Sequence, residues 1–205
     1  MFTGIIEQKT QVKFLEILDN CARLELYGVW TDVEIGESIA VNGVCLTVLT
    51  TGANDMCFDL SLETLNVTKM KTLRAGTWVN LERAVKISAR MGGHYVSGHV
   101  DTQAILLGKK ASGAYQEYIL SSFDARDSHL YLLPKASLTV DGVSLTINRV
   151  EKDKVSLMLV PHTLDNTALG LLHPGDPVNI EFDYITRIVA HQLQSMGQLK
   201  NEVQA

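Results

Sequence analysis

The chain has 205 residues, of which 46% are hydrophobic and 20% are charged, and its formal net charge at pH 7 is −5. This composition is typical of an ordinary soluble globular protein. Without a basic excess the chain is not expected to bind nucleic acid, because a phosphate backbone is held by a positively charged surface.

Targeting and membrane segments are not expected. The first seven residues lack the basic region and apolar run of a secretory signal peptide, and no window approaches about 18 uninterrupted apolar residues. We therefore expect a cytoplasmic protein with no membrane partner. The three cysteines, Cys21, Cys45 and Cys57, are too few and odd in number for a disulfide framework, so reduced thiols are expected.

Alternating apolar and polar residues predict short β-strands in both halves of the chain. The alternation covers residues 11–15, 22–27, 78–82 and 177–182. Turn-forming residues separate such runs at 19–20, 35–36, 51–54, 74–76, 110–113 and 173–175. This spacing is typical of a barrel or a sandwich, and we interpret each half as a small closed β-barrel.

Helices are expected at three places. Short helical turns are predicted after Ser61 and Thr163, which can both cap a helix. In the tail, apolar residues at steps of mostly three and four predict an amphipathic helix from about Tyr184 to Leu199. These residues are Ile185, Ile188, Val189, Leu193, Met196 and Leu199. The apolar stripe predicts self-association of the chain or packing of the helix on one of the barrels.

The second half of the sequence repeats the first. A shift of 99 residues places residues 36–82 on residues 135–181 without a gap, and 15 of these 47 positions are identical. Ordinary composition would give about three identities by chance. Two copies of one unit therefore make up the chain. The glycines of residues 90–100 favour a boundary there. We predict units of residues 1–92 and 93–183, followed by an oligomerisation helix and tail, residues 184–205.

The repeat also aligns polar side chains. Cys45 coincides with Ser144, and Thr47 coincides with Thr146. Residues two apart in a strand share a face, so each copy is expected to carry one polar pair on one side of its barrel.

Other kinds of site are not favoured. The glycines near residue 93 form neither a P-loop nor a dinucleotide-binding motif. Ser144, His99 and Asp183 invite a hydrolase triad, but residues 142–146 lack the second glycine of a nucleophile elbow. His94 and His99 are five residues apart and would lie on opposite faces of a strand, so no metal site is expected.

Three motifs together resemble the riboflavin synthase family of the alpha-chain type, whose domains bind lumazine. They are residues 1–6 (MFTGII), the matching residues 42–47 (NGVCLT) and 141–146 (DGVSLT), and residues 93–100 (GHYVSGHV). The resemblance covers Met1 to about Asp183. It implies an all-β fold of two tandem, pseudo-symmetric six-stranded β-barrels with short helices. It also implies a homotrimer, with each active site between the N-terminal barrel of one subunit and the C-terminal barrel of its neighbour.

The resemblance further implies a transferase of riboflavin biosynthesis. Two molecules of 6,7-dimethyl-8-ribityllumazine would give riboflavin and 5-amino-6-ribitylamino-uracil by transfer of a four-carbon unit. The lumazine ring is electron-poor, so a modest base can remove a proton from its C7 methyl group, and the carbanion adds to the second lumazine. This chemistry needs no metal or redox cofactor.

The resemblance assigns site residues to each barrel. The N-terminal ring site would be lined by Gly4, Ile5, Ile6, Cys45, Leu46, Thr47, Asp59, Leu60, Ser61, Leu62, Glu63 and Thr64. The C-terminal ring site would be lined by Gly98, His99, Val100, Lys135, Ser144, Leu145, Thr146, Met158, Leu159, Val160, Pro161, His162 and Thr163. The candidate catalytic residues are Ser38, Cys45, His99, Ser144, Thr146 and Asp183, with His99 favoured as a proton shuttle.

Each candidate also has a purely structural interpretation. A single cysteine in a strand, such as Cys45, is usually a small buried hydrophobic residue. Asp183 precedes the tail helix and can serve as its N-cap. The alternative function is a non-catalytic lumazine- or flavin-binding protein of the same fold. Such relatives lose several polar site residues, which this chain keeps, and this favours the enzyme.

Overall fold

The computed structural model describes residues 1–52, 54–123 and 128–198. Strands dominate these residues, and the helices are short except at the C-terminus. The strands are β1 (Gln8–Ile17), β2 (Cys21–Tyr27), β3 (Ser38–Val41), β4 (Val44–Thr51), β5 (Asp55–Ser61), β6 (Trp78–Arg83), β7 (Thr102–Ser112), β8 (Tyr115–Ser121), β9 (Ser137–Val140), β10 (Val143–Glu151), β11 (Lys154–Leu159) and β12 (Pro177–Phe182). The helices are α1 (Leu62–Val67), η1 (Lys69–Thr72), α2 (Ser128–Tyr131), α3 (Pro161–Asn166), η2 (Ala168–Leu171) and α4 (Tyr184–Ser195).

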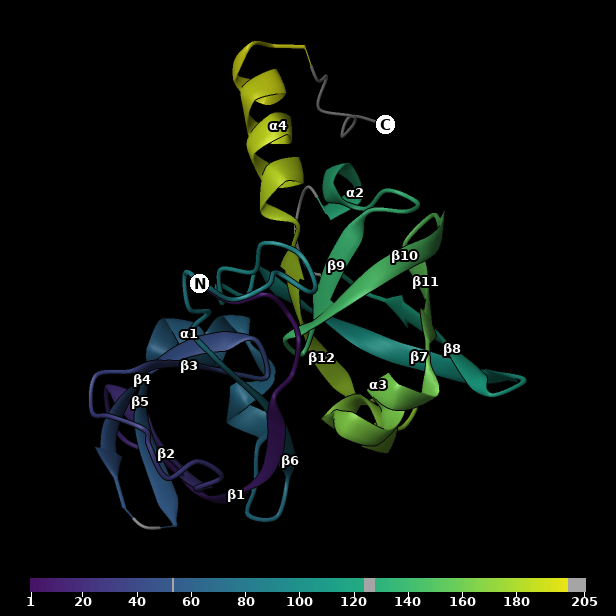
Figure 1. Ribbon diagram of the computed structural model, residues 1–205. Helices are drawn as coiled ribbons and strands as arrows, with labels where there is room; N and C mark the ends of the chain where they lie inside the picture. The colour runs from purple at the N-terminus through teal and green to yellow at the C-terminus, as the bar shows by residue number, and fades with distance from the viewer. Residues whose placement is uncertain (53, 124–127, 199–205) are drawn as a thin grey trace.

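The strands close into two antiparallel barrels, which lie side by side in Figure 1. The N-terminal barrel has the strand order β1-β2-β5-β4-β3-β6, and the C-terminal barrel has the order β10-β11-β8-β7-β12-β9. Residues 84–101 connect β6 to β7. The predicted fold class, two tandem six-stranded barrels with short helices and a C-terminal helix, is confirmed.

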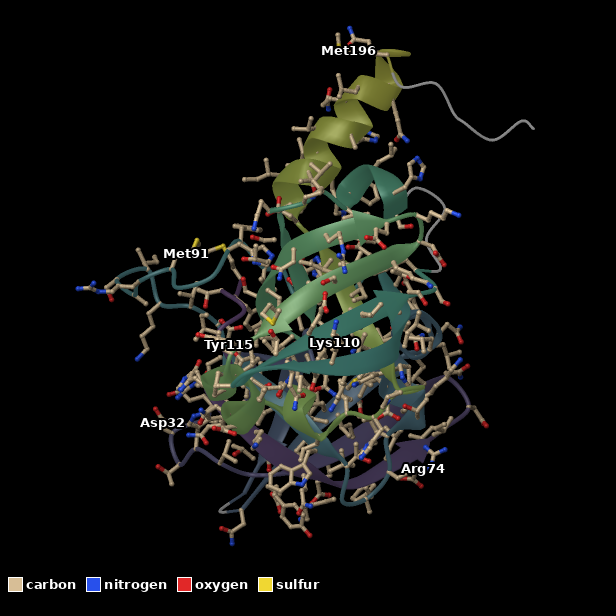
Figure 2. The ribbon with its side chains drawn as sticks, turned by 90° about the vertical axis from the view of Figure 1, so that its right-hand side faces the viewer. Asp32, Arg74, Met91, Lys110, Tyr115 and Met196 are labelled. Atoms are coloured by element: carbon tan, nitrogen blue, oxygen red, sulfur yellow. The ribbon has the colours of Figure 1, made fainter. Side chains whose placement is uncertain are left out.

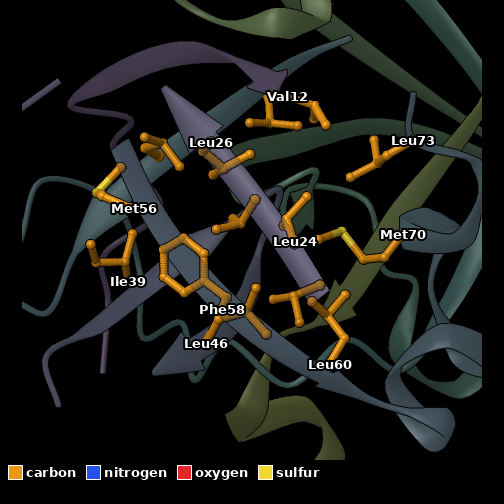
Figure 3. Close-up of a cluster of buried hydrophobic side chains, with 14 of the residues drawn as sticks. Val12, Leu24, Leu26, Ile39, Leu46, Met56, Phe58, Leu60, Met70 and Leu73 are labelled. Carbon is orange, nitrogen blue, oxygen red and sulfur yellow. The ribbon is translucent and has the colours of Figure 1, made fainter. Parts of the chain in front are cut away.

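Each barrel has its own apolar core, built by the alternation seen in the sequence. In β2 the side chains of Leu24 and Leu26 are fully buried, whereas Arg23 between Ala22 and Leu24 is exposed. Figure 3 shows these leucines around Phe58 in the N-terminal barrel. Full burial of one such side chain contributes roughly 1.5–3 kcal/mol. The C-terminal barrel has an equivalent core.

The barrels meet at the turns that the repeat duplicates. Asn80 Nδ2 donates to the carbonyl of Asp141 at 2.8 Å, and Asn179 Nδ2 donates to the carbonyl of Asn42 at 2.9 Å. Gly43 and Gly142 lie against each other, because a Cβ built on either would stand 2.8 Å from the backbone nitrogen of the other. The internal repeat is therefore a structural pseudo-symmetry, with its two copies in direct contact.

The starts of the two short helices differ. Ser61 Oγ accepts the N–H of Thr64 at 3.1 Å and caps α1, as predicted. Short helices also form at the second place, but α3 begins at Pro161, so Thr163 lies inside the helix and does not cap it. Pro161 occupies the first turn, where its fixed φ and missing N–H are tolerated, so the helix begins earlier than the capping residue indicates.

The C-terminal helix α4 starts as predicted and ends early. Asp183 Oδ1 accepts the backbone N–H groups of Ile185 and Thr186 at 2.9 and 3.1 Å, so Asp183 is its N-cap. The helix ends at Ser195, not at Leu199, which lies outside the described residues. Gly197 adopts a φ of 69°, and this left-handed residue terminates the helix.

Most of the described apolar stripe of α4 is exposed in the single chain, although Leu193 is half-buried. Ile185, Ile188, Val189 and Met196 are all exposed. Figure 1 shows α4 projecting away from both barrels beside α2, and Figure 2 shows Met196 at its far end. Of the described helices, none combines the length and the apolar character needed to span a bilayer.

Candidate active site

Equivalent polar faces lie on the outside of the two barrels. On the β3–β4 pair, Ser38 lies opposite Thr47, and Cys45 lies opposite Ala40. Buried Leu46 separates Cys45 from Thr47, so these two side chains share the outer face, as the alternation predicts.

The C-terminal barrel repeats this arrangement on its β9–β10 pair. Ser137 lies opposite Thr146, and Thr139 lies opposite Ser144. Ala40 of the first copy is thus replaced by a hydroxyl-bearing Thr139, and Cys45 is replaced by Ser144. The second polar face therefore offers more hydrogen-bonding groups than the first.

Two irregular segments cross these faces. We name residues 2–6 the first strap and residues 96–100 the second strap. They pair with each other, because the N–H of Phe2 donates to the carbonyl of Val96 at 2.8 Å and the N–H of Val96 donates back at 3.2 Å. The N–H of Ser144 donates to the carbonyl of Gly4 at 2.8 Å, and the N–H of Cys45 donates to the carbonyl of Gly98 at 2.8 Å.

Each strap contacts the barrel opposite to the one with which the predicted ring sites group it. Gly4, Ile5 and Ile6 were expected at the N-terminal ring site, yet Gly4 contacts Ser144 and Ile6 packs against the core of the C-terminal barrel. Gly98, His99 and Val100 were expected at the C-terminal site, yet the second strap contacts Cys45 and packs Val100 against the core of the N-terminal barrel. The straps lie in the seam between barrels, so proximity along the chain does not indicate which barrel they touch.

Glycine is required where each strap crosses a strand. Gly4 has a φ of 77°, and a Cβ built on it would stand 2.6 Å from Cβ of Ser144. Gly98 has a φ of 82°, and its Cβ would stand 2.6 Å from Cβ of Cys45. A side chain at either position would be strained and would push the strap off the polar face.

His94 is a further candidate site residue, one that the sequence reasoning missed. Its Nδ1 lies 2.7 Å from Ser144 Oγ, and its Nε2 lies 3.1 Å from Thr139 Oγ1. Burial lowers the pKa of His94, and the negative charge of Asp183 opposes this effect. The imidazole is therefore neutral at pH 7, with one nitrogen able to accept a proton. From the sequence, His94 was considered only as a metal ligand together with His99.

His99 is exposed and lies in the second strap. Its backbone N–H donates to Ser97 Oγ at 3.2 Å. His94 is in hydrogen-bonding contact with Ser144. His99 lies near Asp101 and acts to lower the pKa of that carboxyl. The histidine in hydrogen-bonding contact with a candidate catalytic residue is thus His94.

The remaining predicted lining residues form equivalent segments of the two copies. Residues 59–64 run from the end of β5 into α1, and residues 158–163 run from the end of β11 into α3. Asp59 is exposed and paired with Arg23, with Oδ1 3.0 Å from Nε. Leu60 and Leu159 are buried in the barrel cores, so only their backbones can reach a ligand on the outer face.

Lys135 and Asp183 occupy special backbone positions. Lys135 is exposed with a φ of 72°, and its N–H donates to the carbonyl of Ile147 at 2.7 Å. Asp183 caps α4 and also lies close enough to influence the pKa of His94. Its structural interpretation as an N-cap is confirmed.

Among the described residues, no group of three or more His, Cys, Asp or Glu side chains is arranged to hold a metal ion. The polar groups of the site are hydroxyls, a thiol, an imidazole and backbone amides. Such groups can orient a planar heterocycle and move protons.

Comparisons with known proteins agree with this geometry. The family model for the lumazine binding domain matches residues 3–84 and 97–183. The chain is 40% identical to riboflavin synthase of Photobacterium phosphoreum, over 94% of this chain and 89% of that protein. It is 38% identical to riboflavin synthase of Bacillus subtilis (strain 168), over 98% and 94% of the two chains.

Solved structures share the fold. The crystal structure of LumP complexed with riboflavin matches with a TM-score of 0.82 at 24% identity, over 89% of this chain and 99% of that one. LumP complexed with 6,7-dimethyl-8-(1'-D-ribityl) lumazine matches with a TM-score of 0.80. With two matched domains and full-length relatives of one name, the chain belongs to the riboflavin synthase family of lumazine-binding proteins.

Proposed function

We propose that this protein is a riboflavin synthase. It converts two molecules of 6,7-dimethyl-8-ribityllumazine into riboflavin and 5-amino-6-(D-ribitylamino)uracil by transfer of a four-carbon unit, the final step of riboflavin biosynthesis. The observation that carries the proposal is the duplicated polar face, Cys45 with Thr47 and Ser144 with Thr146, because the reaction consumes two copies of one substrate. The full-length relatives named riboflavin synthase support the same activity.

Each polar face is proposed to hold one lumazine ring beneath the strap that crosses it. The N-terminal ring site then comprises residues 45–47, 59–64 and 98–100, and the C-terminal ring site comprises residues 4–6, 135, 144–146 and 158–163. The contacts of Gly98 with Cys45 and of Gly4 with Ser144 support this grouping. Leu46 and Leu60 would contribute backbone groups only, since their side chains are buried.

Proton transfer is assigned first to Ser144 and His94. A proton leaving the C7 methyl group can pass to the Ser144 hydroxyl as that hydroxyl gives its own proton to His94 Nδ1. Such general acid–base catalysis contributes on the order of 10²–10⁴-fold. Holding the two rings in reacting geometry can remove about 7–11 kcal/mol of the barrier. Ser38, Cys45, His99, Thr146 and Asp183 complete the proposed catalytic set.

The proposed assembly is a cytoplasmic homotrimer whose active sites combine the N-terminal barrel of one subunit with the C-terminal barrel of its neighbour. The exposure of Thr47, Thr146 and His162, which leaves both faces open in the single chain, supports shared sites. The exposed stripe of α4 supports self-association. The division into residues 1–92, 93–183 and 184–205 belongs to this proposal.

The test of the proposed function is direct. The purified protein is mixed with 6,7-dimethyl-8-ribityllumazine without added metal or nucleotide, and lumazine loss and riboflavin gain are followed together. One riboflavin for every two lumazines consumed is expected. Tight binding without turnover would instead identify a non-catalytic lumazine- or flavin-binding protein.

A further inference from the structure

A buried carboxylate holds each strap. Glu82, in β6 of the N-terminal barrel, is 4% exposed. Its Oε1 accepts the backbone N–H and the hydroxyl of Thr3 at 2.6 and 2.8 Å, and its Oε2 accepts the N–H of Gly4 at 2.9 Å. One side chain therefore fixes two consecutive residues of the first strap.

The second copy repeats this arrangement. Glu181, in β12 of the C-terminal barrel, is 2% exposed. Its Oε1 accepts the N–H and the hydroxyl of Ser97 at 2.6 and 2.7 Å, and its Oε2 accepts the N–H of Gly98 at 3.0 Å. Glu82 and Glu181 are identical positions of the repeat, and the chain thus builds the same three-donor contact twice.

The contact acts across the seam between the barrels. The residue whose N–H reaches Glu82 is Gly4, and the carbonyl of Gly4 accepts the N–H of Ser144 on the other barrel. Likewise, the residue whose N–H reaches Glu181 is Gly98, and the carbonyl of Gly98 accepts the N–H of Cys45. A single strap glycine therefore connects each carboxylate to the polar face of the opposite barrel.

The energetics favour an essential role for these carboxylates in strap position. A hydrogen bond to a charged group is stronger than one between neutral groups. Three such bonds to one buried carboxylate hold that carboxylate and its three donors in place. Burial raises the pKa of both glutamates, and the hydrogen bonds from the straps oppose this effect. Without the strap, either carboxylate would be a buried group with unmet hydrogen bonds, which is costly.

We infer that Glu82 is a positioning residue for the C-terminal ring site and that Glu181 is a positioning residue for the N-terminal ring site. Each barrel sets the geometry of the other barrel's site through one strap. The inference rests on the proposed function only in naming these faces as ring sites. It predicts a crossed response, in which a change in one barrel loosens the polar face of its partner.

Amide hydrogen exchange of the full-length protein without substrate tests the crossed response. In Glu82→Gln, exchange of the Ser144 amide is expected to accelerate by about tenfold to a hundredfold, with that of the Cys45 amide unchanged. In Glu181→Gln, the Cys45 amide is expected to accelerate and the Ser144 amide to stay unchanged. Glu16→Gln, at an exposed position of β1, is the matched control and is expected to change neither.

A milder pair of variants keeps the test decisive if either glutamine variant fails to fold. Thr3→Val and Ser97→Ala remove one hydroxyl donor each and leave both carboxylates in place. They are expected to give the same crossed pattern with smaller accelerations. The inference would be overturned if exchange accelerated at the Cys45 amide in Glu82→Gln or at the Ser144 amide in Glu181→Gln. Equal acceleration of both amides in either variant would also overturn it.

Turnover by the same variants separates this inference from the proposed function. Both glutamine variants are expected to lower kcat/KM for lumazine, because each displaces one of the two ring sites. If the wild-type protein shows no turnover but the glutamine variants show the crossed exchange pattern, the enzymatic function is refuted and the positioning roles stand. If the wild-type protein is an active enzyme but the glutamine variants do not show the crossed exchange pattern, only the positioning roles are refuted.

Discussion

At the residue scale, the two polar faces have diverged in chemistry while keeping the same backbone. Ser144 is hydrogen-bonded to His94, whose other nitrogen meets Thr139. The equivalent Cys45 packs with an apolar cluster of Phe2, Ala40 and Val96. One face can therefore exchange protons through a neutral imidazole, and the other offers a thiol beside apolar side chains. We expect proton transfer to depend more on the C-terminal face.

The pH dependence of stability tests the environment of His94. Because burial lowers its folded-state pKa below the ordinary value of about 6.5, the folded protein binds this proton less readily than the unfolded chain does. The stability contribution is present above about pH 6.5 and is lost as the pH falls toward the folded-state pKa. The free energy of unfolding should thus decrease on acidification.

His94→Gln removes the titrating group and should flatten this dependence. Urea unfolding of both proteins at pH values between about 5 and 7.5 measures the effect. His129→Gln, at an exposed position of α2, is the control and should keep the wild-type slope. Identical slopes in wild type and His94→Gln would show that His94 does not titrate as described.

The contact of Gly4 with Ser144 can be isolated with a matched glycine. Gly36 also has a positive φ, 89°, but a Cβ there would meet nothing within 4 Å. Gly36→Ala should therefore cost only the backbone term of about 1–2 kcal/mol. Gly4→Ala should cost about 1–3 kcal/mol more, because its Cβ collides with Ser144. Equal losses of unfolding free energy in the two variants would contradict a close contact.

At the element scale, strands and the repeat could be predicted because alternation directly reflects which side chains face a core. The helix ends could not, since Pro161 starts α3 before the capping residue and Gly197 ends α4 before the apolar pattern stops. The crossing of the straps was also missed. Their contacts with Ser144 and Cys45 are backbone hydrogen bonds across a seam, and these leave no periodic signal in the sequence.

The α4 helix should govern assembly and not the folding of the barrels. Its apolar residues Ile185, Ile188 and Val189 are exposed and so add little to the core of the single chain. Both barrels are closed by their strands alone. Truncation after Asp183 is therefore expected to leave two folded barrels that sediment as monomers. Ile188→Glu should weaken assembly in the same direction. A truncated protein that still sediments as a trimer would refute a role for α4 in assembly.

At the scale of the whole molecule, a buried ion pair between the barrels is a further departure from the pseudo-symmetry. Lys69, in η1 of the N-terminal half, donates through Nζ to Asp141 Oδ2 in the C-terminal half. The equivalent positions of the repeat hold Ala168 and Asn42, which carry no charge. The backbone contacts around both places are the same, with the N–H of residue 69 meeting Asn179 and that of residue 168 meeting Asn80.

The neutral copy provides a template for removing the ion pair. Lys69→Ala or Asp141→Asn alone should cost about 3–5 kcal/mol of unfolding free energy, because each alters one side of a buried charge pair. The double variant Lys69→Ala/Asp141→Asn reproduces the Ala168–Asn42 arrangement and should be more stable than either single variant. Asn also tolerates the φ of 46° at position 141, as Asn42 does at the same angle. A double-mutant cycle from urea unfolding measures the coupling. Strictly additive losses would mean that Lys69 and Asp141 stabilise the barrel interface independently, and the charge asymmetry would then have no energetic role in joining the halves.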